Sequence, residues 1–447
     1  MNDLTKGKEI KHIVRFSIPL FLGNFFQQLY AITDSVVVGN FVGKNGLAAI
    51  GGAFPYIFAF TSMIIGLSTG FSILVAQYFG AKDYVKLKRV IYSSYYFIIF
   101  VSLIFSIVGL MLSSFFLEKL SIPIEIVGKA KAYLDISFYG LFFVFGYNNI
   151  SAILRGLGDS KTPLYFLILA TILNAALDIL FVVGFSWGVE GSALATVISQ
   201  AISFLLCVIY LHKNHEILKL SFSEFKCDYN ILFLAIKLGI PSGVQQTLVG
   251  FSMIALYRLL SNFGVDAIAA MTAASRIEAF VIMPALNFSI ALTNFSGQNF
   301  GAGLFERSKN GYLITFLLSS LVSILISLVL ICYGANFIML FTRDTKVIEM
   351  GHSYFRIVGM GYLLFSGLVV TNGILMGAGE TLIPMISSFL SLWVGRIPFA
   401  ILLSKFFGIN GLWISIPLGW LLGFSFSYLW YKSGRWKGKI VTLGQKV

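Results

Sequence analysis

Charged side chains are scarce in this sequence of 447 residues. Asp, Glu, Lys and Arg together make up only 11% of it, whereas soluble domains carry roughly 25%. Hydrophobic residues, by contrast, make up 57% of the chain. This composition excludes an ordinary water-soluble domain and indicates a protein that lies within a lipid bilayer.

Cysteine is also rare, and its placement excludes further classes. Cys207, Cys227 and Cys332 are odd in number and far apart, so they predict neither a disulfide framework nor a metal site. The charged first fifteen residues contain no small-residue cleavage site, so we expect no removable signal peptide. Basic residues do not cluster with aromatic residues on a soluble module, so we expect no binding of nucleic acid.

What the chain does have is long apolar runs. Each run reaches the roughly 20 residues that a membrane-spanning helix needs, whereas the strands of a membrane barrel are ~10-residue segments of alternating polarity. We therefore predict an all-α integral membrane protein. Its twelve transmembrane helices have the approximate limits 14–38, 47–78, 90–116, 129–154, 163–185, 190–211, 231–260, 267–298, 311–340, 347–376, 382–404 and 409–431.

The distribution of Lys and Arg predicts the orientation. If both termini lie on one side of the membrane, that side holds twenty basic residues in the termini and loops, and the other side holds seven. The positive-inside rule then places both termini in the cytoplasm. We expect a multi-pass protein of a bacterial or archaeal cytoplasmic membrane.

The sequence repeats itself at an offset of 221 residues. Residues 77–81 (QYFGA) recur as 298–302 (QNFGA), and residues 156–159 (GLGD) recur as 377–380 (GAGE). Six helices per half is an even number, so both halves enter the membrane in the same sense. We predict two parallel six-helix lobes, residues 1–215 and 231–447, related by a pseudo-two-fold axis along the membrane normal and joined by a cytoplasmic linker at 216–230.

A few charged and polar side chains fall inside the predicted helices. A charge at mid-membrane costs about 2.5 to 3.5 kcal/mol on insertion scales, so each one is a functional candidate. The N-terminal half carries such groups on three helices: Gln27, Tyr30 and Asp34 share one face of the first, Asn174 and Asp178 are one turn apart on the fifth, and Thr196 lies on the sixth.

Together these groups predict a cation-coupling site. Their oxygen atoms suit Na⁺, and two neighbouring buried carboxyls can share a proton because both cannot ionise cheaply. If Na⁺ is the coupling ion, we expect Asp34, Asn174, Asp178 and Thr196 to ligate it. Neither acid recurs at the offset of 221, so the site is not duplicated. A structural alternative, in which each carboxylate neutralises an arginine, stays open.

The C-terminal half carries a different set of intramembrane groups. Glu278 follows Arg276 by two residues, and residues two apart do not face each other on a helix, so we expect a cross-helix partner such as Arg396. A structural ion pair and a role in a substrate cavity both stay open for Glu278. The candidate substrate cavity comprises Glu278, Arg276, Gln245, Gln246 and Arg396.

Other energy sources and functions have weaker support in the sequence. Residues 156–162 lack the glycine that a phosphate loop has directly before its lysine, and no strand precedes them. Without an ATP-binding domain, we expect a secondary transporter. An intramembrane enzyme with Asp34 and Asp178 as a protease dyad would need helix motifs that are absent. A flippase for a lipid-linked sugar would favour a cavity lined by Arg276, Arg356 and Arg396, which would hold phosphate.

In combination, these motifs resemble the multidrug and toxic compound extrusion (MATE) family. The resemblance is carried by residues 27–39, the two QxFGA elements, the turn RGLGDSKTP at 155–163 and Asn174-x-x-x-Asp178. Residues 275–278 (SRIE) and 396–398 (RIP) match the C-terminal half of that family. The resemblance covers essentially the whole chain.

The resemblance implies efflux of organic, often cationic, drugs in exchange for H⁺ or Na⁺ by alternating access of two lobes. It also implies that Gln27, Tyr30, Asp34, Asn174, Asp178 and Thr196 form a cation-linked network. Gln245 and Gln246 occupy the helix-7 region where one branch carries an acid, so the resemblance favours the DinF-like branch. We expect no enzymatic activity, no cofactor besides the coupling ion, small amphiphilic drugs and membrane lipid as partners, and a monomer.

Overall fold

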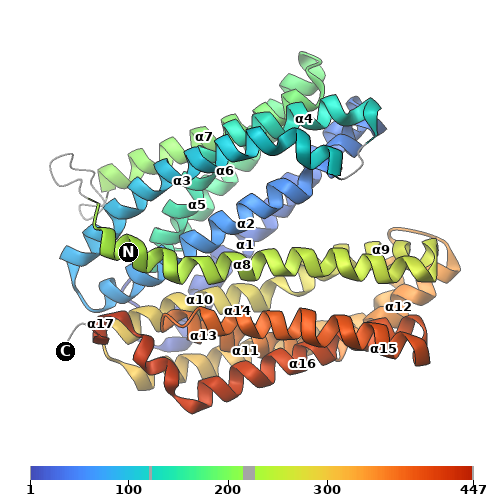
Figure 1. The fold of residues 1–447 in the computed structure, drawn as a ribbon. Helices are drawn as coiled ribbons and strands as arrows, with labels where there is room; N and C mark the ends of the chain where they lie inside the picture. Colours follow the sequence, from blue (N-terminus) through green and yellow to red (C-terminus); the bar gives the residue numbers. More distant parts are fainter. Residues whose placement is uncertain (1, 120–122, 215–226, 445–447) are drawn as a thin grey trace. The chain divides into compact units, whose positions relative to one another are not determined.

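The predicted apolar segments are helices in the computed structural model of the protein, which describes residues 2–119, 123–214 and 227–444 (Figure 1). No β-strand occurs within these ranges. The helices of the N-terminal repeat are α1 (Glu9–Phe41), α2 (Lys44–Gly80), α3 (Tyr84–Lys119), α4 (Ile124–Tyr139), α5 (Leu141–Gly156), α6 (Lys161–Asp178), η1 (Ile179–Gly184) and α7 (Gly188–Asn214).

The C-terminal repeat follows the same order, with additional interruptions within three of its segments. They are α8 (Tyr229–Leu260), η3 (Ser261–Phe263), α9 (Val265–Val281), α10 (Met283–Gly301), α11 (Phe305–Met339), α12 (Thr345–Gly359), α13 (Tyr362–Gly377), α14 (Leu382–Phe389), η4 (Leu390–Arg396), α15 (Ile397–Phe407) and α16 (Ile409–Ser433). The short helices η5 (Arg435–Lys439) and α17 (Val441–Gly444) follow in the C-terminal tail.

Most of these helices can span a membrane. Within the described ranges, nine are long and apolar enough, and the bent pairs α4 with α5 and α12 with α13 raise the number to eleven. The remaining predicted segment is α1, whose 33 residues are interrupted by polar side chains such as Gln27 and Asp34 and do not pass the same test. The predicted all-helical membrane fold is confirmed, and each predicted segment corresponds to one helix or one interrupted helix.

Two helix breaks are related by the sequence repeat. α4 bends by 49° into α5, and α12 bends by 51° into α13; Gly140 and Gly361, which are 221 residues apart, lie at these breaks. A Cβ on Gly140 would overlap Val197 of α7, and one on Gly361 would overlap Pro417 of α16. Glycine at both positions therefore lets each bent helix pack closely on the last long helix of its repeat.

Two π-helical segments were not predicted from the sequence. η1 continues α6, and η4 lies between α14 and α15. Asp178 directly precedes η1, and Arg396 is the last residue of η4. Because π-turns change which side chains share a helix face and are frequent at functional sites, Asp178 and Arg396 are candidate functional residues.

The chain divides into two compact units. Unit 1 consists mainly of Leu22–Val75 and Asp83–Gly243, and unit 2 of Asp3–Phe21, Ala76–Lys82 and Val244–Val447. The lobe boundaries drawn from the sequence stay a prediction. Residues 216–226 of the predicted linker at 216–230 lie outside the described residues.

In unit 1, α7 packs against α4, α5 and α6, and α3 packs against α4 and α5. α2 also crosses the first half of α8 at very close range. A Cβ on Gly66, Gly70 or Gly239 would overlap backbone atoms of the facing helix. Gly66 and Gly70 form one GxxxG motif, and Gly239 and Gly243 form another, the pattern that allows membrane helices to approach closely.

In unit 2, α13 packs against α10, α11 and α16, while α12 packs against α9 and α11. Tyr354, Phe355 and Trp413 are completely buried in one core cluster of this unit. The rings of Tyr354 and Trp413 meet edge to face with centroids 5.1 Å apart, which is an arrangement that aromatic pairs prefer. Tyr354 of this cluster also donates a hydrogen bond to the buried Glu278 of α9.

The repeated glycine turns have the same conformation. Gly158 has φ +81° and Gly379 has φ +90°, in the left-handed region that glycine enters without strain. Asp159 Oδ1 accepts hydrogen bonds from the amides of Lys161 and Thr162 at 3.0 and 3.1 Å, which caps the start of α6. The segment is a turn that starts a helix in both repeats, which agrees with its lack of the phosphate-loop pattern.

Candidate functional site

A buried pair of acids lies in unit 1. Asp34, on α1, is only 7% exposed, and Asp178, at the end of α6, is completely buried. Their carboxyl groups lie close enough to interact. The structure therefore brings together two residues that are 144 positions apart in the sequence.

The two carboxyl groups have different partners. Asp34 Oδ1 accepts a hydrogen bond from the hydroxyl of Ser192 on α7. Neither oxygen of Asp178 has a hydrogen-bond partner among the described residues. Neither acid forms an ion pair with a basic residue in the described part of the chain, so the arginine-neutralised alternative is not what the structure shows.

Polar groups on α6 and α7 surround the acid pair. The amide nitrogen of Asn174 lies 3.5 Å from the hydroxyl of Thr196, while Asn174 Oδ1 is buried without a partner. Tyr30 on α1 interacts with Asp34, Asp178 and Thr196. Five of the six predicted coupling residues thus lie near one another, and they offer several oxygen atoms with unused acceptor capacity.

The sixth predicted residue, Gln27, differs from the others. Its side chain is exposed, and it lies two helical turns before Asp34 on α1. The structure does not include it in the hydrogen-bonded group around the acids. We therefore keep its role in coupling as a prediction.

Two residues of this site were missed from the sequence. Ser192 is completely buried and donates to Asp34, and Tyr133 on α4 interacts with both acids and with Tyr30. The spacing of Ser192 and Thr196, four residues apart on one helix face, is the signal that would have found Ser192. Tyr133 lies in α4 without a comparable pattern of polar residues that points to the acids.

A second buried acid lies in unit 2. Glu278 on α9 is 8% exposed, and its Oε2 accepts a hydrogen bond from the hydroxyl of Tyr354 on α12 at 2.7 Å. Arg396 interacts with Glu278 through its charge, but the two side chains do not form an ion pair within 4 Å. The Nε atom of Arg396 is buried without a hydrogen-bond partner among the described residues. Glu278 does have a cross-helix partner, as predicted, but the hydrogen-bonded partner is Tyr354, and the predicted Arg396 interacts at longer range.

The other residues of the candidate substrate cavity have different surroundings. Gln245 on α8 donates from Nε2 to the hydroxyl of Ser388 on α14 at 2.7 Å. Arg276 and Gln246 are exposed. Glu278 and Arg396 are therefore the buried members of the predicted set.

No cluster of three or more His, Cys, Asp and Glu side chains with metal-binding geometry occurs among the described residues. A cation at the unit 1 site would be held by two carboxyls together with neutral oxygens, those of Asn174 and Thr196. This donor set consists of hard oxygens, which suits H⁺ or an alkali cation rather than a transition metal.

The helical membrane fold with its internal repeat and buried, unneutralised acids defines a membrane transporter. A family model described as MatE matches residues 19–180 and again residues 241–402, which are the two repeats seen in the sequence. The chain belongs to this family, the multidrug and toxic compound extrusion transporters.

Relatives with known names agree with this assignment. The chain is 31% identical over 436 residues to the "Probable multidrug resistance protein YpnP" of Bacillus subtilis, and the match covers 97% of each chain. It is 25% identical over 446 residues to the "Probable multidrug resistance protein NorM" of Thermotoga maritima, covering 98% of this chain and 95% of the relative.

A solved structure has the same fold. A MOP superfamily transporter from Pyrococcus furiosus superposes with a TM-score of 0.91 at 25% sequence identity, and the match covers 98% of both chains. The shared fold confirms the prediction of a two-lobe, all-helical transporter.

Proposed function

We propose that the protein is a secondary active antiporter that exports organic, often cationic, compounds in exchange for H⁺ or Na⁺. The observation that carries this proposal is the Asp34 and Asp178 pair, which is buried and has no basic partner among the described residues. The relatives named as multidrug resistance proteins support the substrate class.

The physical reason is the cost of buried charge. Two carboxylates in a low-dielectric site repel each other and lose their hydration, so at least one must bind a cation or a proton. A proton on Asp178, or Na⁺ held by both acids with Asn174 and Thr196, satisfies this requirement. Binding and release of that cation then changes the affinity of the unit for a cationic drug, because both are attracted by the same negative charge.

The surrounding residues supply the selectivity of the coupling step. The Ser192 hydroxyl stabilises the ionised form of Asp34, which favours Asp178 as the acid that takes up the proton. The protein works in a prokaryotic cytoplasmic membrane with both termini in the cytoplasm, as a monomer and without a cofactor besides the coupling ion. The basic loops support this orientation.

Transport by the purified protein in proteoliposomes tests the proposal. Dye efflux is measured under an imposed pH gradient and, separately, an imposed Na⁺ gradient. Asp34→Asn and Asp178→Asn are expected to reduce gradient-driven efflux at least tenfold while the protein still inserts. Asp135→Asn is the matched control, because Asp135 on α4 already pairs with Lys131 at 2.6 Å, and it is expected to transport normally.

Two outcomes would contradict the proposal. Fully coupled efflux by both Asp34→Asn and Asp178→Asn would remove the acids from the coupling step. Failure of the wild type to move any cationic dye, together with movement of a lipid-linked sugar, would favour the flippase alternative.

A further inference from the structure

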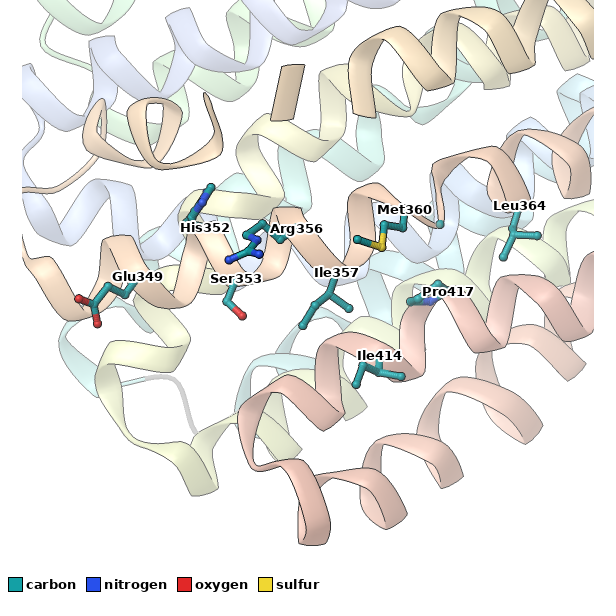
Figure 2. Close-up of a pocket in the computed structure, with 10 residues that line it drawn as sticks. Glu349, His352, Ser353, Arg356, Ile357, Met360, Leu364, Ile414 and Pro417 are labelled. Atoms are coloured by element: carbon teal, nitrogen blue, oxygen red, sulfur yellow. The ribbon is translucent and has the colours of Figure 1, made fainter. Parts of the chain in front are cut away.

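A pocket on unit 2 lies apart from both groups of buried acids. It has a volume of about 810 Å³ and is formed by α12, the start of α13 and α16. Figure 2 shows that polar and charged side chains, from Glu349 to Arg356, gather at one end of it, and that Met360 and Leu364 lie toward the other end. The pocket is therefore amphiphilic along its length.

The internal repeat provides a control for the charged end. At the offset of 221, His352 and Arg356 correspond to Lys131 and Asp135 of α4. Lys131 and Asp135 are four residues apart and form a closed ion pair with an N–O distance of 2.6 Å. In the C-terminal repeat the acid of this pair is replaced by a second basic residue.

This replacement leaves the charges of the pocket without internal partners. Neither Arg356 nor Glu349 forms an ion pair or a hydrogen bond with any other described residue. Nδ1 of His352 is buried without a hydrogen-bond partner next to Gly334 of α11, which does not line the pocket. Arg356 belongs to the bent helix pair that crosses the membrane. A cationic group at such a position favours an external anion, because an unpaired charge near the hydrocarbon is costly.

The rest of the pocket is suited to hydrocarbon. Ile357, Met360, Leu364, Ile414 and Pro417 line it, and Met360 is 74% exposed. The hydroxyl of Ser353 donates to Oδ1 of Asn410 at 2.6 Å, which joins α12 to the start of α16 and fixes the polar end of the groove.

We propose that this pocket binds a phospholipid. The phosphate lies against Arg356 and His352, the headgroup amine lies against Glu349, and an acyl chain follows Met360 and Leu364. The amine, the phosphate and the acyl chain of the lipid, in that order, match the acid, the basic residues and the apolar residues that follow one another along α12 and α13. By the topology predicted from the basic loops, α12 begins on the outer side of the membrane, so the lipid comes from the outer leaflet.

The closed pair on α4 explains why the proposal concerns one repeat only. Lys131 and Asp135 neutralise each other, so the pair that corresponds to His352 and Arg356 offers no free cation for a phosphate. Bidentate phosphate recognition by arginine is a charge-assisted interaction that is roughly twice as strong as a neutral hydrogen bond.

Native mass spectrometry of the purified full-length protein in detergent tests the proposal. Phosphatidylethanolamine and phosphatidylglycerol are titrated separately, and the affinity of the tightest bound lipid is measured. Arg356→Gln is expected to weaken this first lipid about tenfold, a loss typical of one hydrogen-bonded charge. Lys131→Gln, which removes a basic residue at the position that corresponds to His352 in the other repeat, is the control and should bind lipid as the wild type does.

Two further variants separate lipid binding from folding. Met360→Glu places a carboxylate in the apolar part of the groove and is expected to weaken both lipids, while Glu349→Gln should remove a preference for phosphatidylethanolamine over phosphatidylglycerol. Thermal unfolding in lipid-free detergent is expected to be the same for Glu349→Gln, Arg356→Gln and the wild type.

The proposal would be overturned by equal lipid affinity of the wild type and Arg356→Gln, or by weakening in Lys131→Gln to the same extent. A further experiment adds inorganic phosphate to the lipid-bound protein. If phosphate alone at equal concentration displaces the first lipid, the pocket is a site for free anions and not for a phospholipid. These readouts do not depend on efflux, so they stand or fall separately from the antiport proposal.

Discussion

Gly80 of α2 and Gly301 of α10 lie at the point in unit 2 where these two helices cross. A Cβ on Gly80 would overlap the carbonyl of Gln298, and a Cβ on Gly301 would overlap the carbonyl of Gln77. The two glycines are 221 residues apart, so the internal repeat places equivalent residues in reciprocal contact. The QxFGA elements therefore recur because each needs a glycine where the helices touch.

The glutamines of the two elements also have related roles. Oε1 of Gln298 accepts a hydrogen bond from the amide of Leu4 at 2.9 Å, and Oε1 of Gln77 accepts one from the amide of Val441 at 2.9 Å. One glutamine thus holds the start of the chain and the other holds its C-terminal tail. Nε2 of Gln77 also donates to the carbonyl of Gly377 at 2.9 Å.

Alanine at either crossing glycine is expected to destabilise the protein. Gly80→Ala or Gly301→Ala forces backbone atoms apart, and overpacking of this kind costs about 1 to 3 kcal/mol or more. Thermal unfolding in detergent measures the effect. Gly51→Ala on the same α2 is the control, because nothing lies within 4 Å of a Cβ there, and alanine should leave stability unchanged or raise it slightly. Equal behaviour of all three variants would show that the crossing is not as close as described.

Glu380 predicts a pH dependence of stability. It is the counterpart of Asp159 in the second repeat, it is 4% exposed, and burial raises the pKa of its carboxyl above the ordinary value, although Lys439 and the amides of Ile383 and Leu382 oppose this. Below the ordinary carboxyl pKa, Glu380 is protonated in both folded and unfolded chains. As the pH rises above that value, the unfolded chain ionises first, so stability is lost until the folded carboxyl also ionises.

Glu380→Gln removes this ionisation and keeps an oxygen that can accept from the helix amides. The variant is expected to unfold at a higher temperature than the wild type at pH 7, and the difference should disappear as the pH falls below the ordinary carboxyl pKa. Glu306→Gln, which alters an exposed glutamate of α11, is the control and should show a small difference at every pH. A stability advantage of Glu380→Gln that grows toward low pH would contradict the assignment.

The hydrogen bond between Tyr354 and Glu278 predicts that substitutions of its two partners lower stability by different amounts. Tyr354→Phe leaves a buried carboxylate without its donor, which is expected to lower the free energy of unfolding by about 1.5 to 3 kcal/mol. Glu278→Gln keeps a hydrogen bond to the tyrosine, and so should cost less. Tyr333→Phe, at an exposed position of α11, is the control for loss of a hydroxyl.

The same variants decide between the two roles left open for Glu278. If Glu278→Gln slows efflux or narrows the range of exported compounds at unchanged stability, Glu278 belongs to the substrate cavity. If it changes stability alone and every compound is exported as before, its role is structural. A double-mutant cycle with Tyr354→Phe measures the coupling between the two side chains.

Most of the fold could be predicted because it depends on local sequence. Apolar runs and polar breaks locate each helix to within a few residues, and the repeated motifs around Gly80 and Gly158 mark equivalent positions in the two halves. The breaks between α4 and α5 and between α12 and α13 could not be predicted, because a glycine is also compatible with a continuous helix. Only the close contacts with the facing Val197 and Pro417 show why glycine is needed there.

The site could be predicted only in part for a similar reason. Asp34 and Asp178 were found because a charge within an apolar helix is unusual and costly. Ser192 and Tyr354, which donate to Asp34 and Glu278, are ordinary residues for a membrane helix, and only three-dimensional contact makes them partners. The π-helical turn after Asp178 likewise depends on packing and not on any residue type that the sequence shows.

Ser192 gives a sharp test of the coupling site, because it touches the acid pair without being ionisable itself. Ser192→Ala removes the hydroxyl that donates to Asp34, so ionised Asp34 loses about 1.5 to 3 kcal/mol of stabilisation. Efflux driven by an ion gradient is expected to fall about tenfold, and its dependence on external pH should change. Ser192→Thr keeps a hydroxyl and is expected to restore part of the activity.

Ser203 provides the matched control for this test. It lies on the same helix, is completely buried and has no hydrogen-bond partner among the described residues. Ser203→Ala should therefore leave efflux and its pH dependence unchanged, since it removes a buried hydroxyl that stabilises nothing. If Ser203→Ala and Ser192→Ala reduce efflux equally, the effect comes from altered packing of α7, and the hydrogen bond to Asp34 has no special part in coupling.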